Sequence, residues 1–208
     1  MAEWLIYSLG FVAQMLFSAR LISQWVISEK HKKVLTPSLF WQFSLLASFL
    51  LFVYGWLRDD FAIMLGQILT YFIYIRNIQL QGEWNKFPKI VRWFIWVFPF
   101  IIIWYGYNNN NYDLNDFFKN EAIPTWLLAL GIVAQLIFTL RFVYQWMYSE
   151  KRKESTLPFG FWLLSLIGSL LILTYAIYRK DPVLLVGHGF GCIVYVRNII
   201  LLKNEHQS

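Results

Sequence analysis

Charged residues are scarce in this chain of 208 residues. Asp, Glu, Lys and Arg make up 14% of it, whereas ordinary soluble domains carry about 25%. Cysteine is nearly absent too, because Cys192 is the only one, and this excludes a disulfide framework or a cysteine-based metal site. With 58% hydrophobic residues, the composition argues against a water-soluble domain.

Acidic side chains are missing from every long apolar run of the sequence. This excludes paired membrane-embedded carboxylates for acid–base chemistry or proton coupling. A nucleophile elbow, a phosphate loop and a zinc motif are also lacking. His188 has no second ligand at metal-binding spacing, so we predict an ordinary polar contact for it. The sequence therefore predicts a protein that is not an enzyme and has no metal and no cofactor.

The sequence contains seven apolar runs, and the length of each is close to the ~17–25 residues that a helix needs to cross a bilayer. The runs are Trp4–Ile27, Leu39–Leu57, Phe61–Leu80, Ile90–Tyr107, Trp126–Tyr148, Phe161–Tyr178 and Val183–Leu202. They are apolar nearly all round, so polar surface is lacking to cover them in water. The first run has no basic segment or cleavage site typical of a signal peptide. We therefore predict an all-α integral membrane protein with seven transmembrane helices.

The basic residues between these runs predict the orientation in the membrane. Clusters at 29–33, 86–92 and 150–153, together with Lys203, fall on one side if seven spans alternate. By the positive-inside rule that side is cytoplasmic. The N-terminus then lies on the outer side, as does the polar stretch 108–121, and the C-terminus is cytoplasmic. The net charge of +6 is thus explained by topology, and nucleic acid is not an expected partner.

The chain also contains an internal repeat. Shifted by 121 positions, residues 10–80 align with 131–201 without a gap, and about 28 of the 71 pairs are identical. Each copy holds three helices, and the extra helix at 90–107 reverses the chain so that both copies face the same way. We predict a 3+1+3 arrangement of two parallel three-helix bundles: a first repeat at 1–81, a linker at 82–121 with one transmembrane helix and a polar loop, and a second repeat at 122–208.

Polar side chains inside the apolar runs are the candidate binding residues. An Arg at such depth costs about 2.5–3.5 kcal/mol on insertion scales, so we expect Arg20 to face the protein interior or a wet cavity. Arg forks suit phosphate, whereas Asn, Gln and Trp suit sugars. The predicted substrate-binding residues, all in the cytoplasmic half, are Arg20, Gln24, Trp41, Arg76, Asn77, Arg141, Gln145, Trp162, Arg197 and Asn198. The set favours a phosphate-bearing, glycosylated lipid headgroup.

Structural roles stay open for some of these residues. Arg76 and Arg197 lie close enough to the ends of their runs to reach phospholipid phosphates. Trp41 and Trp162 also suit an aromatic belt at the membrane surface.

Two flanking pairs have simpler interpretations. Glu29-Lys30 and Glu150-Lys151 are expected to be helix-end ion pairs and topology signals. Pro37 and Pro158 predict helix starts, although a proline can also serve as a hinge for gating.

One polar pattern occurs in both repeats: Arg-x3-Gln-Trp-x2-Ser-Glu-Lys, then Pro-x2-Phe-Trp-x2-Ser, a Tyr, an Asp, and finally Tyr-x-Arg-Asn. The first copy consists of Arg20, Gln24, Trp25, Ser28, Glu29, Lys30, Pro37, Phe40, Trp41, Ser44, Tyr54, Asp60, Tyr74, Arg76 and Asn77. The second consists of Arg141, Gln145, Trp146, Ser149, Glu150, Lys151, Pro158, Phe161, Trp162, Ser165, Tyr175, Asp181, Tyr195, Arg197 and Asn198. This pattern resembles the lipid A biosynthesis N-terminal domain family, and its two copies cover about two-thirds of the chain.

The resemblance implies a role in envelope glycolipid synthesis at the bacterial inner membrane. The family takes its name from fusion to lipid-A-disaccharide synthase, but the glycosyltransferase domain is not in this sequence, so synthase activity is not expected. The 3+1+3 plan is similar to SWEET and PQ-loop transporters. Their Pro-Gln dipeptide is missing, however, since Ser38 follows Pro37 and Phe159 follows Pro158.

We therefore expect a transporter or flippase-like protein for a lipid-linked sugar or lipid A-type precursor. The first alternative is a non-transporting scaffold that presents lipid substrate to a separate glycosyltransferase. The second is a SWEET-like facilitator for small sugars. The expected partners are membrane lipid, a phosphate-bearing glycolipid or polyprenyl-phosphate sugar and, for the scaffold, a glycosyltransferase.

Overall fold

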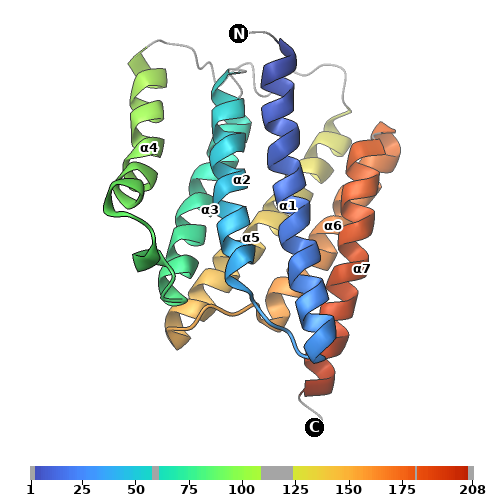
Figure 1. Ribbon diagram of the computed structural model, residues 1–208. Coiled ribbons are helices and arrows are strands. Elements are labelled where there is room, and N and C mark those ends of the chain that lie inside the picture. The colour runs from blue at the N-terminus through green and yellow to red at the C-terminus, as the bar shows by residue number, and fades with distance from the viewer. Residues whose placement is uncertain (1–2, 58–60, 109–123, 181, 206–208) are drawn as a thin grey trace. The chain divides into compact units, whose positions relative to one another are not determined.

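The computed structural model describes residues 3–57, 61–108, 124–180 and 182–205 (Figure 1). These residues form one short 3₁₀ helix, η1, and seven α-helices. In chain order they are α1 (Glu3–His31), α2 (Ser38–Leu57), α3 (Phe61–Leu80), η1 (Trp84–Lys86), α4 (Lys89–Asn108), α5 (Thr125–Arg152), α6 (Phe159–Arg179) and α7 (Pro182–Glu205). The all-α prediction is confirmed, and each predicted apolar run lies within one helix. Asp60, Asp181 and most of the polar stretch 108–121 lie outside the described residues.

Within the part of the chain that the structure describes, three stretches of helix are long and apolar enough to cross a membrane. They are Trp4–His31, Thr125–Arg152 and Phe159–Tyr178, and the apolar stretch Ser38–Tyr54 is shorter. Large apolar side chains such as Phe11, Trp104 and Leu136 are exposed along the helices. Soluble proteins rarely expose so much continuous apolar surface. The chain is therefore a membrane protein.

The helix ends follow from the repeated polar sequence. Lys32 and Lys153 adopt left-handed backbone conformations, with φ of 51° and 55°. In both copies the N–H of the following residue bonds the carbonyl five residues back, that of Ser28 or Ser149, at 3.2 Å. This closure satisfies carbonyls that a helix end would otherwise leave open. It ends α1 and α5 about one turn beyond the predicted apolar runs.

The prolines act as predicted at the helix starts. α2 begins directly after Pro37 and α6 directly after Pro158, and Pro158 has an extended backbone with φ −72° and ψ 166°. Proline has no N–H, so a helix start is the position where it costs no hydrogen bond.

The helices belong to two compact units. The first contains α1 as far as Arg20, together with α2, α3 and α4; the second contains the rest of α1 from Leu21, together with α5, α6 and α7. Within the first unit α2 packs on α3, and Phe98 of α4 joins Phe52 of α2 in a buried cluster. Within the second unit α6 packs against both α5 and α7.

A glycine sets the distance between α5 and α6. A Cβ added at Gly168 would lie 2.9 Å from the backbone Cα and N of Phe138. Backbone atoms cannot yield as a flexible side chain does, so only glycine allows this approach.

Candidate binding site

The first unit buries an arginine among hydroxyls and aromatic rings. Arg20, only 8% exposed, donates from Nη1 to Ser44 Oγ at 2.8 Å and to Tyr74 Oη at 3.3 Å. Its guanidinium carbon lies 4.7 Å from the ring centroid of Phe17 and 5.3 Å from that of Phe40. The guanidinium of Arg20 thus links α1 to α2 and α3.

The second unit repeats this arrangement. Arg141 is 4% exposed and donates from Nη1 to Ser165 Oγ and Tyr195 Oη, both at 3.2 Å. Its guanidinium carbon lies 3.5 Å from the Phe138 centroid and 5.5 Å from the Phe161 centroid. We call each set, the Arg with its Ser, Tyr and surrounding rings, an arginine cluster.

The clusters suit a charge that is held away from water. Hydroxyl oxygens accept from the guanidinium, and ring faces attract it electrostatically. In a low-dielectric interior both interactions are stronger than in water. Ser44, Ser165, Tyr74 and Tyr195 were not among the predicted binding residues, although each is identical between the repeats. The signal that could have identified them is that the same polar residue occurs at the same position of both repeats.

A tryptophan lies beside each cluster. Trp41 and Trp162 are fully buried, and their rings are 6.0 Å from those of Tyr74 and Tyr195. Such burial does not fit an aromatic belt at a lipid surface. Each indole Nε1 is buried without a hydrogen-bond partner among the described residues. Since buried indole donors usually find an acceptor, these two are suited to a ligand hydroxyl.

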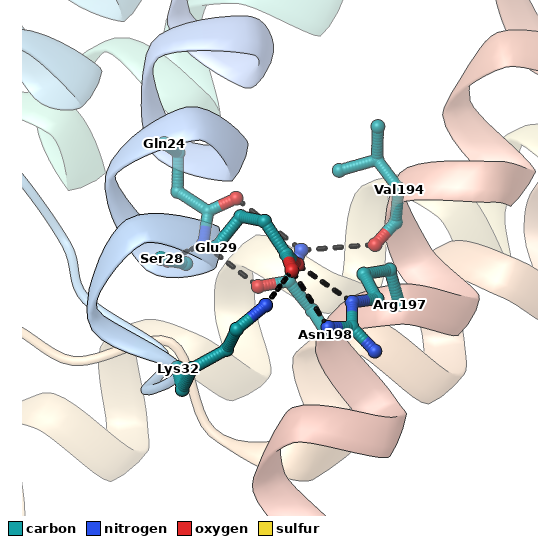
Figure 2. Close-up of polar contacts among 7 residues, drawn as sticks. All are labelled: Gln24, Ser28, Glu29, Lys32, Val194, Arg197 and Asn198. Atoms are coloured by element: carbon teal, nitrogen blue, oxygen red, sulfur yellow. Dashed lines mark hydrogen bonds and ion pairs between the residues drawn. The ribbon is translucent and has the colours of Figure 1, made fainter.

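The predicted glutamines have different contacts. Gln24 forms a reciprocal amide pair with Asn198: its Nε2 donates to Oδ1 at 2.8 Å, and Nδ2 of Asn198 donates to Oε1 of Gln24 at 3.3 Å (Figure 2). Gln145 donates to Ser149 Oγ and to the Thr156 carbonyl, both at 2.9 Å. All of these amides are fully buried. The pair ties α1 to α7 within the second unit.

Arg76 of α3 and Arg197 of α7 have hydrogen-bond partners outside the arginine clusters. Arg197 donates from Nε and Nη2 to the two carboxylate oxygens of Glu29, at 2.7 and 2.8 Å (Figure 2). Arg76 donates to Gln79 Oε1 at 3.2 Å. Neither contact belongs to an arginine cluster, so the structure separates these two from Arg20 and Arg141.

The predicted pairing of each helix-end glutamate needs a correction. Besides its pair with Arg197, Glu29 forms a salt bridge with Lys32, and Glu150 forms one with Lys153. The adjacent lysines, Lys30 and Lys151, were expected instead. Neighbouring residues on a helix point in different directions, whereas residues three apart share a face.

The predicted contact for His188 is present. Its Nδ1 lies 3.0 Å from Ser169 Oγ, and its ring meets Phe138 edge-on at 5.0 Å. Among the described residues, no three His, Cys, Asp or Glu side chains gather as metal ligands. Asn77, like Asn198, donates to the carbonyl one turn back on its helix, at 2.9 Å.

Comparisons with known proteins agree with this duplicated geometry. A lipid-A-disaccharide synthase of Chlamydia felis is 28% identical over 210 residues, which are 96% of this chain and 33% of that protein. The synthase of Chlamydia pneumoniae is also 28% identical, over 99% of this chain and 35% of its own length. The chain thus spans about one third of these relatives.

A shorter similarity covers about one repeat. The sugar transporter SemiSWEET of a Vibrio species is 29% identical over 80 residues, which are 38% of this chain and 81% of the transporter. No solved structure gives a significant match. The sequence model of the Lipid A Biosynthesis N-terminal domain matches residues 9–79 and again residues 130–200. With both repeats matched, the chain belongs to the lipid A biosynthesis N-terminal domain family.

Proposed function

We propose that this protein moves a phosphate-bearing glycolipid, a polyprenyl-phosphate sugar or a lipid A-type precursor, across the bacterial inner membrane. The observation that carries the proposal is the arginine cluster, present in both repeats with the same Arg, Ser and Tyr. A guanidinium within an apolar helix is costly, so its presence in each copy favours a function for the charge. Its fork of N–H donors matches the oxygens of a phosphate.

The neighbouring side chains supply the other half of the headgroup's chemistry. Trp41 and Trp162 offer indole N–H donors and flat ring faces, which suit sugar hydroxyls and the apolar faces of sugar rings. Gln24, Gln145 and the asparagines Asn77 and Asn198 add amide donors and acceptors. Arg76 lies one turn before the end of α3 and Arg197 about two turns before the end of α7; in the proposed orientation both would meet a phosphate that enters from the cytoplasm.

The proposed architecture is a 3+1+3 arrangement in which all seven helices cross the membrane. The N-terminus is periplasmic, and α4 serves as a topological reversal between two parallel bundles. The similarity to a SemiSWEET, which is named a sugar transporter, supports this plan, because that protein matches about one repeat. Rocking of one repeat against the other would then alternate access to the headgroup site.

A second function is favoured by the synthase relatives, of which this chain matches about one third. In this alternative the protein is a scaffold that presents lipid substrate to a separate glycosyltransferase and transports nothing. A small-sugar facilitator is favoured only by the SemiSWEET match. The buried arginines argue for an anionic cargo instead.

Reconstitution tests the proposal. Vesicles that carry the protein and a fluorescent polyprenyl-phosphate sugar are assayed for transfer of the headgroup between leaflets. Arg141→Gln and Arg20→Gln are expected to slow transfer roughly tenfold or more, since each removes charge-assisted hydrogen bonds of about 1.5–3 kcal/mol. Arg152→Gln is the matched control. It removes the same charge from an exposed position at the end of α5 and should leave the rate unchanged.

The outcomes separate the three functions. Headgroup transfer that depends on Arg20 and Arg141 supports the transporter. Binding without transfer, together with co-purification of a glycosyltransferase, supports the scaffold. Uptake of free sugar at equal rates in the wild type and both variants supports the facilitator. If vesicles transfer neither polyprenyl-phosphate sugars nor lipid A precursors, the proposal is wrong. Arg141→Lys, which keeps the charge, separates a loss of charge from a failure to fold.

A further inference from the structure

The carboxylate of Glu29 lies between two basic side chains. Arg197 of α7 donates two parallel hydrogen bonds to it, and Lys32, the residue after the end of α1, forms a salt bridge to its Oε1 (Figure 2). The side chains of Glu29 and Arg197 are 35% and 34% exposed. The ion pair is thus accessible from the surrounding solvent while the two helices hold it in place.

The helices on both sides of this ion pair are tied to one another. Five residues before Glu29 on α1, Gln24 forms the buried amide pair with Asn198, which directly follows Arg197 on α7. Beyond the end of α1, the backbone N–H of Val34 donates to the Glu205 carboxylate at 2.7 Å. These contacts fix where the guanidinium of Arg197 points. A fixed guanidinium is a better anion site than a freely moving one, because less side-chain entropy is lost on binding.

The geometry at Arg197 is that of an occupied anion site. A two-bond fork from Arg to a carboxylate is the same contact that Arg makes with two phosphate oxygens. A lysine beside it adds the point charge that often accompanies a bound phosphate. The carboxylate of Glu29 therefore occupies the place that a phosphate group would take.

We propose that Arg197 and Lys32 form a phosphate-binding site, and that Glu29 fills this site until a phosphate displaces it. The inference rests on the proposed function for the source of the phosphate, a lipid headgroup, and it adds Lys32 and Glu29 to the site. Both partners are about one-third exposed, so the pair is only partly withdrawn from water and an incoming phosphate can reach the guanidinium and replace the carboxylate. Displacement would also loosen the end of α1 against α7, because Glu29 is one of the contacts that join them, while the Gln24–Asn198 and Val34–Glu205 contacts remain.

Binding measurements on the full-length protein in phosphatidylcholine nanodiscs test this competition. The probes are inorganic phosphate and farnesyl phosphate, which distinguish a free phosphate from a lipid-borne one. Glu29→Gln is expected to bind farnesyl phosphate about fivefold more tightly than the wild type, which is the effect of removing a competing exposed ion pair. The double variant Glu29→Gln with Arg197→Gln should lose this gain.

Glu83→Gln is the matched control. Glu83 also pairs with a lysine three residues on, Lys86, at 2.7 Å, so the same charge is removed from the same kind of pair. The affinity of the Glu83→Gln variant for both probes should equal that of the wild type. A second readout is the distance between spin labels at Lys33→Cys and Lys203→Cys in a Cys192→Ser background. It should increase in Glu29→Gln without any probe, and in the wild type when farnesyl phosphate is added.

The results separate this inference from the proposed function. Equal or weaker binding by Glu29→Gln overturns the competition, as does a gain that survives loss of Arg197 or a complete lack of binding by every variant. Transfer of polyprenyl-phosphate sugars in vesicles would then still support the transporter. Conversely, tighter binding by Glu29→Gln in a protein that transfers no lipid supports the phosphate site and not transport. Tighter binding of farnesyl phosphate but not of inorganic phosphate assigns the site to a lipid headgroup.

Discussion

The two repeats keep the polar cross-links of their arginine clusters and change their packing. Arg20 and Arg141 donate to a Ser and a Tyr at equivalent positions, at distances between 2.8 and 3.3 Å in the first copy and 3.2 Å in the second. The apolar neighbours differ: Gly168 of the second copy corresponds to Ala47 of the first. Many apolar combinations fill a given space, but a buried guanidinium needs acceptors at fixed places. The cross-links are therefore the more constrained part.

The largest expected effect comes from making the second repeat resemble the first at this glycine. Gly168→Ala places a Cβ 2.9 Å from the Phe138 backbone, and we expect a loss of about 3 kcal/mol of unfolding free energy from overpacking. Reversible unfolding in SDS measures it. The reciprocal Ala47→Gly should cost only about 1 kcal/mol, the usual helix penalty of glycine. Equal losses of unfolding free energy for the two changes would show that the helices pack equally closely at Gly168 and at Ala47.

The next effect tests the equivalence of the arginine clusters. Ser44→Ala and Ser165→Ala each remove an acceptor from a buried guanidinium, so each should lower the unfolding free energy by about 2 kcal/mol. The two losses should agree, because both hydroxyls accept from Nη1 of their arginine. Ser8→Ala is the control. Its hydroxyl is exposed and bonds only the Leu5 carbonyl, so a change below about 0.5 kcal/mol is expected. Losses that differ greatly between the clusters contradict the equivalence.

A smaller effect is expected where the repeats differ chemically. His188 corresponds to Gln67, so His188→Gln brings the second copy to the sequence of the first. The amide can replace the imidazole as a partner of Ser169, and we expect a change within about 0.5 kcal/mol. His188→Leu removes the partner and should cost about 1 kcal/mol. Thermal unfolding of both variants in detergent decides the point, and equal behaviour of the two would exclude a role for the hydrogen bond.

The smallest effect is expected at the matched glycines of α1 and α5. A Cβ at Gly10 would lie 3.0 Å from the Tyr54 ring, and one at Gly131 the same distance from the Tyr175 ring. Alanine favours a helix by about 1 kcal/mol over glycine, and displacement of a ring edge offsets this gain. Gly10→Ala and Gly131→Ala should therefore both change the melting temperature little, and in the same direction. Changes of opposite sign in the melting temperature would show that the rings of Tyr54 and Tyr175 differ in how freely they can move aside.

Much of the fold was predictable because apolar runs report helices directly. The seven runs gave the seven helices of the described chain, and Pro37 and Pro158 gave two of the starts. α1 and α5 extend about one turn past their apolar runs, to the helix ends that the Glu29-Lys30 and Glu150-Lys151 pairs indicated, and the N–H of Lys33 and of Glu154 closes each end on the carbonyl of Ser28 or Ser149. Composition alone does not report a polar turn that stays helical.

The candidate site was predictable only in part. Depth and duplication pointed to Arg20 and Arg141, and the same duplication marked their Ser and Tyr partners. The pairing of Gln24 with Asn198 was not predictable, because it joins residues 174 positions apart and depends on how helices pack. The same holds for Arg197 and Glu29, 168 positions apart. A sequence gives the chemistry of such groups but not their partners.

The amide pair between α1 and α7 also constrains how the protein is made. During synthesis the first helix leaves the ribosome long before α7 exists, so Gln24 must wait in the membrane or in the translocon without its asparagine. Such a group in hydrocarbon is unfavourable, and incomplete chains are exposed to misassembly. The last helix of the described chain, α7, therefore supplies the hydrogen-bond partner that Gln24 of α1 lacks until then. A nascent chain stalled before α7 would be a natural target for quality-control proteases.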